Sequence, residues 1–186
     1  IIGQKYTNAP YAPYGGYNLF LVYYKNIFIG STTSNISISK NLAKKIFPIK
    51  REDFFRVRAD DVVVFYASMM RESYFIHHQL SEYRIHGSNL FASNYKKITN
   101  SQKYKRFLVM SEVKKEILSK MNIDNSFLNN GYFLFSEFTT KHIIDFHILK
   151  VYLEILWFEM KIPFIKKLQI SYNLLKYFNK YKRNFI

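Results

Sequence analysis

The stretch RADDVVVFYASMM (58–70) constrains the fold more than any other part of the sequence. Two adjacent carboxylates, Asp60 and Asp61, open it, and apolar side chains follow with few interruptions. On a helix from Asp60 to about Arg71 these apolar residues lie all round, which predicts a helix buried on most sides. The chain must therefore fold around this segment, and 186 residues are enough for one domain with a substantial core.

The hydrophobic content of the sequence indicates a folded chain, and its positive net charge indicates a chain that attracts anions. Hydrophobic residues make up 48 % and aromatic residues 19 %, which is enough apolar surface to exclude a disordered chain. The net charge of +15 predicts attraction to polyanions. It does not choose between phosphate-bearing small molecules, nucleic acid and anionic lipid.

Cysteine usage and hydropathy bear on the compartment. The absence of cysteine excludes disulfides and thiolate metal sites and fits a reducing compartment. Charged residues interrupt the two longest apolar stretches, 17–30 and 143–160, so we expect no membrane-spanning helix. The start, IIGQKYTNAP, has neither an initiator Met nor a signal pattern, and we expect a fragment of a longer chain.

The first part of the chain reads as mixed α/β. The aromatic run 17–30 predicts a strand or a short helix, and the alternation of Ile and Ser in 36–38 predicts a short strand. Ser39 is placed to cap a helix that stops before Pro48. Segment 73–86 predicts two short strands or one bent strand.

The second part reads as helical. We expect a helix over 101–121 with a Glu116–Lys120 pair, a loop rich in Asn, and a long helix from about Phe133 to Met160 that Pro163 ends. A last basic helix over 164–186 shows an apolar face made of Ile165, Leu168, Tyr172 and Leu175. The expected domains are 1–97 and 98–186.

The carboxylate pair has two interpretations. Acids in the first turn of a helix satisfy free N–H groups and meet the positive end of the helix dipole, for about 0.5–2 kcal/mol. Alternatively, Asp60 or Asp61 projects into a cleft as a general base, although the dipole lowers the pKa of a carboxyl group and so weakens it as a base.

The segment YRIHGSN (83–89) also has two interpretations. A single His at the end of a strand is often structural, but strand alternation places Arg84 and His86 on one face, where they could contact a diphosphate or a metal–diphosphate. The neighbours His77 and His78 would point to opposite faces and read as structural. His142, Asp145 and His147 lack the spacing of a helical zinc site.

Three segments in order resemble the C-terminal part of the catalytic domain of family-two glycosyltransferases, the inverting enzymes of the GT-A fold. They are TTSNISISKNLAKKIFPI (32–49), FRVRADDVVVFYASM (55–69) and LSEYRIHGSNL (80–90). The resemblance implies an α/β fold class: the C-terminal, acceptor-side portion of a GT-A domain over 1–97, followed by an all-helical extension over 98–186.

The same resemblance implies roles for individual residues. Asp61 would deprotonate the acceptor hydroxyl, with Asp60 as the alternative base. His86 would contact the metal or the diphosphate, and Arg84 the same phosphates, while Ser34 and Asn35 would lie on the acceptor side. The partners implied are a nucleotide-diphospho-sugar donor and a glycan or lipid-linked acceptor, as in surface polysaccharide or glycan synthesis.

The chain departs from the family in one respect. The D-x-D motif that binds the divalent metal (Mg²⁺ or Mn²⁺) and the sugar nucleotide lies upstream in the family, and this sequence contains none. We therefore expect the nucleotide-binding half to be missing and the 186 residues alone to be inactive. The intact parent would be the enzyme.

The competing hypothesis is a non-catalytic, basic helical module that binds anionic membrane or nucleic acid through its tail. After Glu159 the sequence carries seven cations and no acid. No nucleic-acid motif supports the nucleic-acid alternative, so we expect none as a partner. The location expected is cytoplasmic, with a peripheral contact at the inner face of the membrane.

Overall fold

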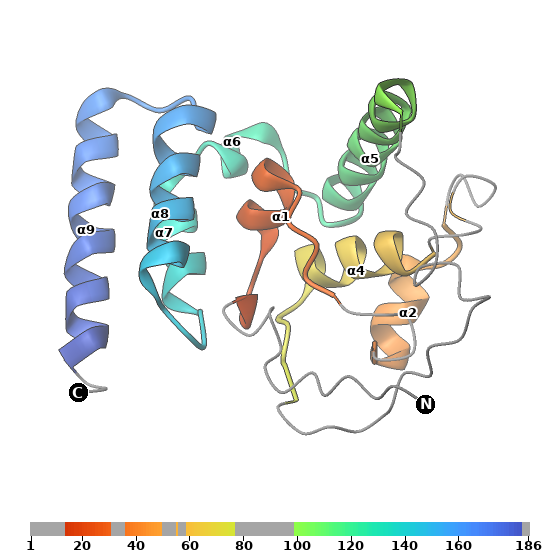
Figure 1. Ribbon diagram of the computed structural model, residues 1–186, viewed down its shortest axis with the longest axis horizontal. Helices are drawn as coiled ribbons and strands as arrows, with labels where there is room; N and C mark the ends of the chain where they lie inside the picture. The colour runs from red at the N-terminus through yellow and green to blue at the C-terminus, as the bar shows by residue number, and fades with distance from the viewer. Residues whose placement is uncertain (1–13, 31–35, 50–54, 56–58, 77–98, 184–186) are drawn as a thin grey trace.

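The computed structural model describes residues 14–30, 36–49, 55, 59–76 and 99–183 (Figure 1). Regular structure in these residues is helical. The elements are α1 (Leu19–Lys25), α2 (Lys40–Ile46), α4 (Ala59–Met70), α5 (Asn100–Lys120), α6 (Asn125–Leu128), α7 (Gly131–Thr139), α8 (Phe146–Glu154), the π-helical turn η3 (Ile155–Glu159) and α9 (Phe164–Arg183).

The predicted α/β fold class is wrong, because the described residues form no sheet. Run 17–30, predicted as a strand or a short helix, contains the helix α1. The short strand predicted over 36–38 has no partner strand among the described residues and leads into α2. Of the strands predicted over 73–86, residues 73–76 are described, and Ser73 makes a single antiparallel bridge with Gly16. Hydrophobic alternation over three residues was too short a signal to specify a strand.

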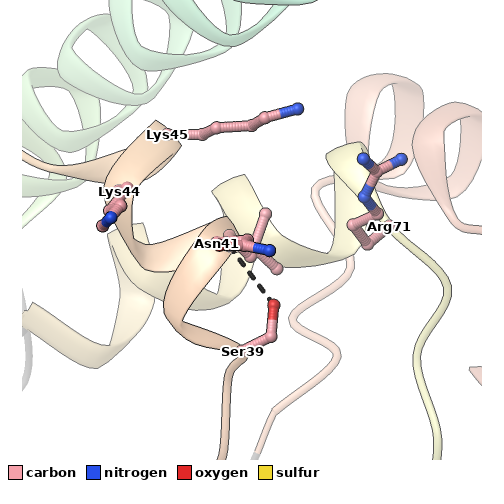
Figure 2. Close-up of a pocket in the computed structure, with 6 residues that line it drawn as sticks. Ser39, Asn41, Lys44, Lys45 and Arg71 are labelled. Carbon is pink, nitrogen blue, oxygen red and sulfur yellow. Dashed lines mark hydrogen bonds between the residues drawn. The ribbon is translucent and has the colours of Figure 1, made fainter.

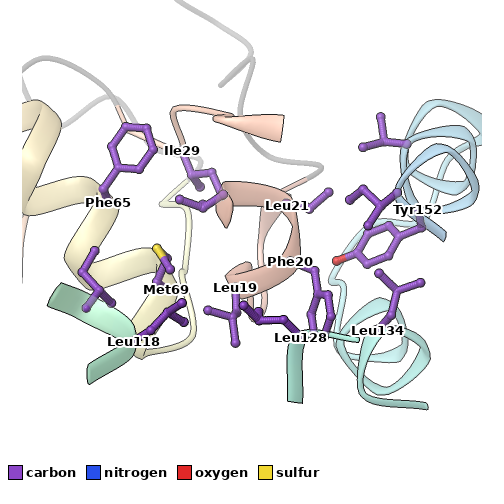
Figure 3. Close-up of a cluster of buried hydrophobic side chains, with 14 of the residues drawn as sticks. Leu19, Phe20, Leu21, Ile29, Phe65, Met69, Leu118, Leu128, Leu134 and Tyr152 are labelled. Atoms are coloured by element: carbon purple, nitrogen blue, oxygen red, sulfur yellow. The ribbon is translucent and has the colours of Figure 1, made fainter. Parts of the chain in front are cut away.

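Helix α1 lies at the centre of the molecule. Its residues Leu19, Phe20, Leu21 and Val22 are all buried. In Figure 3 the helix stands between α4 on one side and α7 and α8 on the other, and side chains from all of them form one hydrophobic core. Helices from both predicted domains, 1–97 and 98–186, thus pack against the same seven-residue helix.

Several predictions about helices in the first part are confirmed. Helix α2 begins after Ser39, whose hydroxyl accepts from the Leu42 N–H at 3.2 Å. Helix α4 is buried on most of its surface, as the all-round apolar pattern predicted. Its buried apolar side chains are Val62, Val64, Phe65, Tyr66 and Met69.

Helix α5 also agrees with the sequence. Thr99 and Gln102 form a reciprocal capping box at its start, and the predicted Glu116–Lys120 ion pair has an N–O distance of 3.2 Å. The Lys120 ammonium further donates to the carbonyl of Ile46, at 3.2 Å, and so joins α5 to the end of α2.

The single long helix predicted from Phe133 to Met160 is wrong. The chain breaks between α7 and α8, where Asp145 caps α8 by accepting from the Ile148 N–H at 2.7 Å. A side chain that caps a helix start favours a new helix over the continuation of the old one. After the break, α7 and α8 lie on the same side of α1, and both pack against α9 (Figure 1).

The helix predicted over 164–186 is confirmed as α9, and it packs through apolar residues that lie off the face described from the sequence. Its buried side chains are Ile170, Leu174 and Phe178. The inward face fits α7 closely, because a Cβ at Gly131 would stand 2.1 Å from the Cδ1 atom of Ile170. The predicted face, Ile165, Leu168, Tyr172 and Leu175, is exposed.

Gly16 joins three parts of the chain. It exchanges two backbone hydrogen bonds of 2.9 Å with Ser73, just beyond α4, and its carbonyl accepts from the Asn18 amide at 2.7 Å. Its φ angle is +94°, and a Cβ there would stand 2.4 Å from the backbone oxygen of Thr140. Glycine is required here by conformation and by space.

We predict that Gly16→Ala lowers the free energy of unfolding by about 2–4 kcal/mol, since both a strained φ and a backbone clash result. Gly15→Ala is the matched control, because its Cβ would meet the movable ring of His142. Urea unfolding followed by circular dichroism measures both. Equal losses in the two variants would contradict this account of Gly16.

Candidate functional site

Asp60 and Asp61 lie in the first turn of α4, as predicted. Asp60 is half-buried, whereas Asp61 is only 4 % exposed. The Asp61 carboxylate pairs with the Arg106 guanidinium of α5, with 2.5 Å between Oδ2 and Nη2. This pair ties the start of α4 to α5.

The two carboxylates therefore differ in what they can do. A general base must come within hydrogen-bond reach of the proton that it removes. Asp60 is the more open of the two, and Asp61 is held by a cation that stabilises its charged form. To act as the base, the Asp61 carboxylate would have to give up part of its contact with Arg106 and accept a hydrogen bond from the acceptor hydroxyl.

The other predicted site residues cannot be placed beside this pair. Ser34 and Asn35 on the acceptor side, and Arg84 and His86 on the donor side, lie outside the described residues. The roles assigned to them stay predictions. His77 and His78 lie outside as well.

The histidines of the second part have partners within the fold. His142 Nε2 lies 3.0 Å from a carboxylate oxygen of Glu72, and His147 Nε2 lies 3.3 Å from the Tyr14 hydroxyl. Within the described ranges no group of three His, Cys, Asp or Glu side chains could hold a metal ion. His86, the residue predicted to contact the metal, lies outside these ranges.

A basic hollow lies between α2 and the end of α4 (Figure 2). Its volume is about 410 Å³, and it is lined by Ser39, Asn41, Leu42, Lys44, Lys45 and Arg71. The three cations favour an anionic ligand. However, the Ser39 hydroxyl already caps α2, and the lysines are exposed, so the hollow is an electropositive surface without a formed binding geometry.

A buried polar network surrounds the start of α1. The Glu137 carboxylate accepts from the N–H groups of Phe20 at 2.9 Å and Leu21 at 3.4 Å, and from the Tyr152 hydroxyl at 2.8 Å. Lys141 donates to the Tyr17 carbonyl and, at 2.5 Å, to Oδ1 of Asn18. Three of these five hydrogen bonds go to backbone groups at or before the start of α1, which makes the network a structural one.

Burial shifts the pKa values of Glu137 and Lys141 in opposite directions. It raises the pKa of Glu137, while the nearby Lys141 ammonium acts in the opposite direction. It lowers the pKa of Lys141 to about 8, against the effect of the Glu137 carboxylate. Neither residue was among the predicted site residues. Their i,i+4 spacing inside the apolar run FLFSEFTTKH was the available signal.

A second buried cation holds the other end of α1. The Lys114 ammonium of α5 donates to the Tyr23 carbonyl at 2.5 Å and stands 5.5 Å from the centroid of the Tyr23 ring. Burial lowers the pKa of Lys114 to about 8. A cation is favoured here because carbonyl groups in the last turn of a helix carry the negative end of its dipole.

We predict a pH dependence of stability that comes from Lys114. Its pKa falls from 10.5 to about 8 on folding, so between these values the unfolded chain binds the proton that the folded chain has lost. Stability therefore rises with pH in this window, by about 1–2 kcal/mol from pH 8 to 10.

The measurement is the difference in unfolding free energy between wild type and Lys114→Met at several pH values. Tyrosine titrations common to both proteins cancel in this difference. Lys115→Met removes an exposed cation of the same helix and serves as the control. If the unfolding free energy of the wild type, relative to that of Lys114→Met, does not increase between pH 8 and 10, the effect assigned to burial of Lys114 is contradicted.

No helix of the described residues is both long enough and apolar enough to cross a membrane. Comparison of the chain with protein-family models, with curated proteins and with solved structures gives no match in any of the three.

Proposed function

We propose that this chain is the acceptor-side part of an inverting glycosyltransferase, which transfers a sugar from a nucleotide-diphospho-sugar to an acceptor hydroxyl. The proposal concerns the activity and not the fold class, since the described residues are helical. A glycan or a lipid-linked sugar is the acceptor class that the resemblance implies, and a cytoplasmic site of action belongs to the same proposal.

One observation carries the proposal: three chemistry-bearing segments occur in the order found in family-two glycosyltransferases. Segment 32–49 precedes the carboxylate pair of 55–69, and the YRIHGSN segment of 80–90 follows. Each segment alone has a structural explanation. Their order and separation within one chain favour a role in sugar transfer over a purely structural role at the ends of helices and strands.

The structure adds support for one step only. The carboxylate pair stands in the first turn of α4, a helix that is buried on most of its surface. In the proposed reaction one carboxylate takes the proton of the acceptor hydroxyl, whose oxygen bonds to the anomeric carbon as the bond to the diphosphate breaks. Position in the motif favours Asp61 as this base, whereas exposure favours Asp60.

The donor side of the proposal rests on residues outside the described ranges. Arg84 and His86 would stabilise the negative charge that develops on the leaving diphosphate. A divalent Mg²⁺ or Mn²⁺ ion would share that task. Ser34 and Asn35 would lie on the acceptor side of the same cleft.

The first test reads the coding sequence upstream of Ile1. The proposal predicts an open reading frame with a D-x-D motif, and a full-length product that hydrolyses or transfers from a sugar nucleotide. A start codon at or next to Ile1 would contradict it.

The second test compares variants of the full-length product. Asp61→Asn should lower turnover by about 10²–10⁴-fold, the usual contribution of a general base, while sugar-nucleotide binding survives. Asp60→Asn tests the alternative base. Arg106→Met is the control, because it removes the partner of Asp61 and leaves the carboxylate in place.

Turnover retained in both Asp variants would show that the base lies elsewhere. An equal loss of turnover in Arg106→Met and Asp61→Asn would show that Asp61 acts through its ion pair with Arg106, which anchors α4 to α5. Either result would contradict the role proposed for the carboxylate pair.

A further inference from the structure

Helix α9 has two apolar faces, and in the part of the chain that the structure describes the inner one is buried while the other is largely exposed. The inner face packs on α7 and α8 through buried side chains. A second group of apolar side chains, which we name the outer stripe, is between 44 and 78 % exposed. The outer stripe consists of Phe164, Ile165, Leu168, Tyr172 and Leu175.

The outer stripe is continuous along the helix. Its members are spaced by one, three, four and three residues, which places them along one side of an α-helix over about 17 Å. Figure 1 shows α9 at one edge of the molecule, with α7 and α8 to one side of it. At its start the stripe meets the rest of the fold, because the Phe164 ring packs edge-on against Trp157 with 5.6 Å between centroids.

Cations border the outer stripe, and no acid accompanies them. The sequence contains no Asp or Glu after Glu159, and Glu159 itself pairs with Lys25 at 3.6 Å. Lys167 turns inward and donates to the Trp157 carbonyl at 2.8 Å. The exposed cations are Lys161, Lys166, Lys176, Lys180, Lys182 and Arg183.

We propose that the outer stripe of α9 docks on the surface of an anionic lipid membrane. A helix that lies in a membrane interface buries an apolar face and places lysines against the lipid head groups, and α9 offers both on its free side. Each cation close to an anionic surface increases the affinity about fivefold. The inference stands on α9 alone and does not depend on the proposed glycosyltransferase activity.

The chemistry of the stripe favours lipid over two other occupants. A second copy of this face would bring its own cations beside these, with no carboxylate on the helix to pair with them. Single-stranded nucleic acid would use stacking on aromatic rings, whereas three of the five stripe residues are aliphatic. An acyl-chain boundary accepts aliphatic and aromatic side chains alike.

The test is cosedimentation of the 186-residue chain with vesicles of phosphatidylglycerol in phosphatidylcholine, and with vesicles of phosphatidylcholine alone. We expect binding to the first and at least tenfold weaker binding to the second. Raising the salt from about 0.1 M to about 1 M shortens the Debye length from roughly 10 Å to 3 Å and should release most of the protein.

Variants separate the apolar and the charged contributions. The triple variant Ile165→Ser, Leu168→Ser and Tyr172→Ser should bind the anionic vesicles at least tenfold more weakly. Lys176→Gln with Lys180→Gln should weaken binding and reduce its dependence on salt. All five side chains are exposed, so these changes should leave the fold intact, as circular dichroism would verify.

The matched control replaces three exposed apolar residues of α5 with serine: Tyr104, Phe107 and Leu108. This variant should bind as the wild type does. Equal loss in the α5 and α9 triple variants, binding that ignores lipid charge, or no binding at all would overturn the proposal. So would sedimentation velocity that shows dimers through α9, or binding of a single-stranded oligonucleotide in place of vesicles.

Discussion

The fold depends on how a seven-residue helix, α1, is held at both ends by buried ionisable groups. The Glu137 carboxylate accepts from N–H groups of its first turn, and the Lys114 ammonium donates to a carbonyl of its last turn. Charges of these signs match the helix dipole and satisfy groups that a short buried helix would otherwise leave unpaired. Because α1 fills the space between α4 and the pair α7 and α8, its two ends fix the positions of both sides of the core.

The helices α2, α4, α5 and α9 could be predicted from end signals and apolar patterns in the sequence. Ser39, the buried pattern of α4 and the Glu116–Lys120 pair led to correct helices. The strand interpretation of 36–38 failed because a few alternating residues do not specify a partner strand. The buried face of α9 could not be chosen from the sequence because both of its faces are apolar, and contacts with α7 and α8, which lie earlier in the chain, bury the inner one.

The candidate site could likewise be predicted only in part from the sequence. Two carboxylates in the first turn of α4 could be predicted from the sequence, but the partner of Asp61 could not, since Arg106 lies 45 residues away. The resemblance that assigns a base to this pair remains a hypothesis about activity. What the fold adds is the difference between the two acids: Asp61 is buried and paired with Arg106 of α5, whereas Asp60 is the more exposed.

The most direct test of the role of α1 is residue-resolved amide hydrogen exchange at Phe20 and Leu21. First-turn amides usually exchange readily, because they lack a partner within the helix. If the buried Glu137 carboxylate holds them, both should exchange at least about a hundredfold more slowly, relative to their intrinsic rates, than the exposed first-turn amide of Gln102 in α5. Protection at Phe20 and Leu21 no greater than at Gln102 would contradict the account.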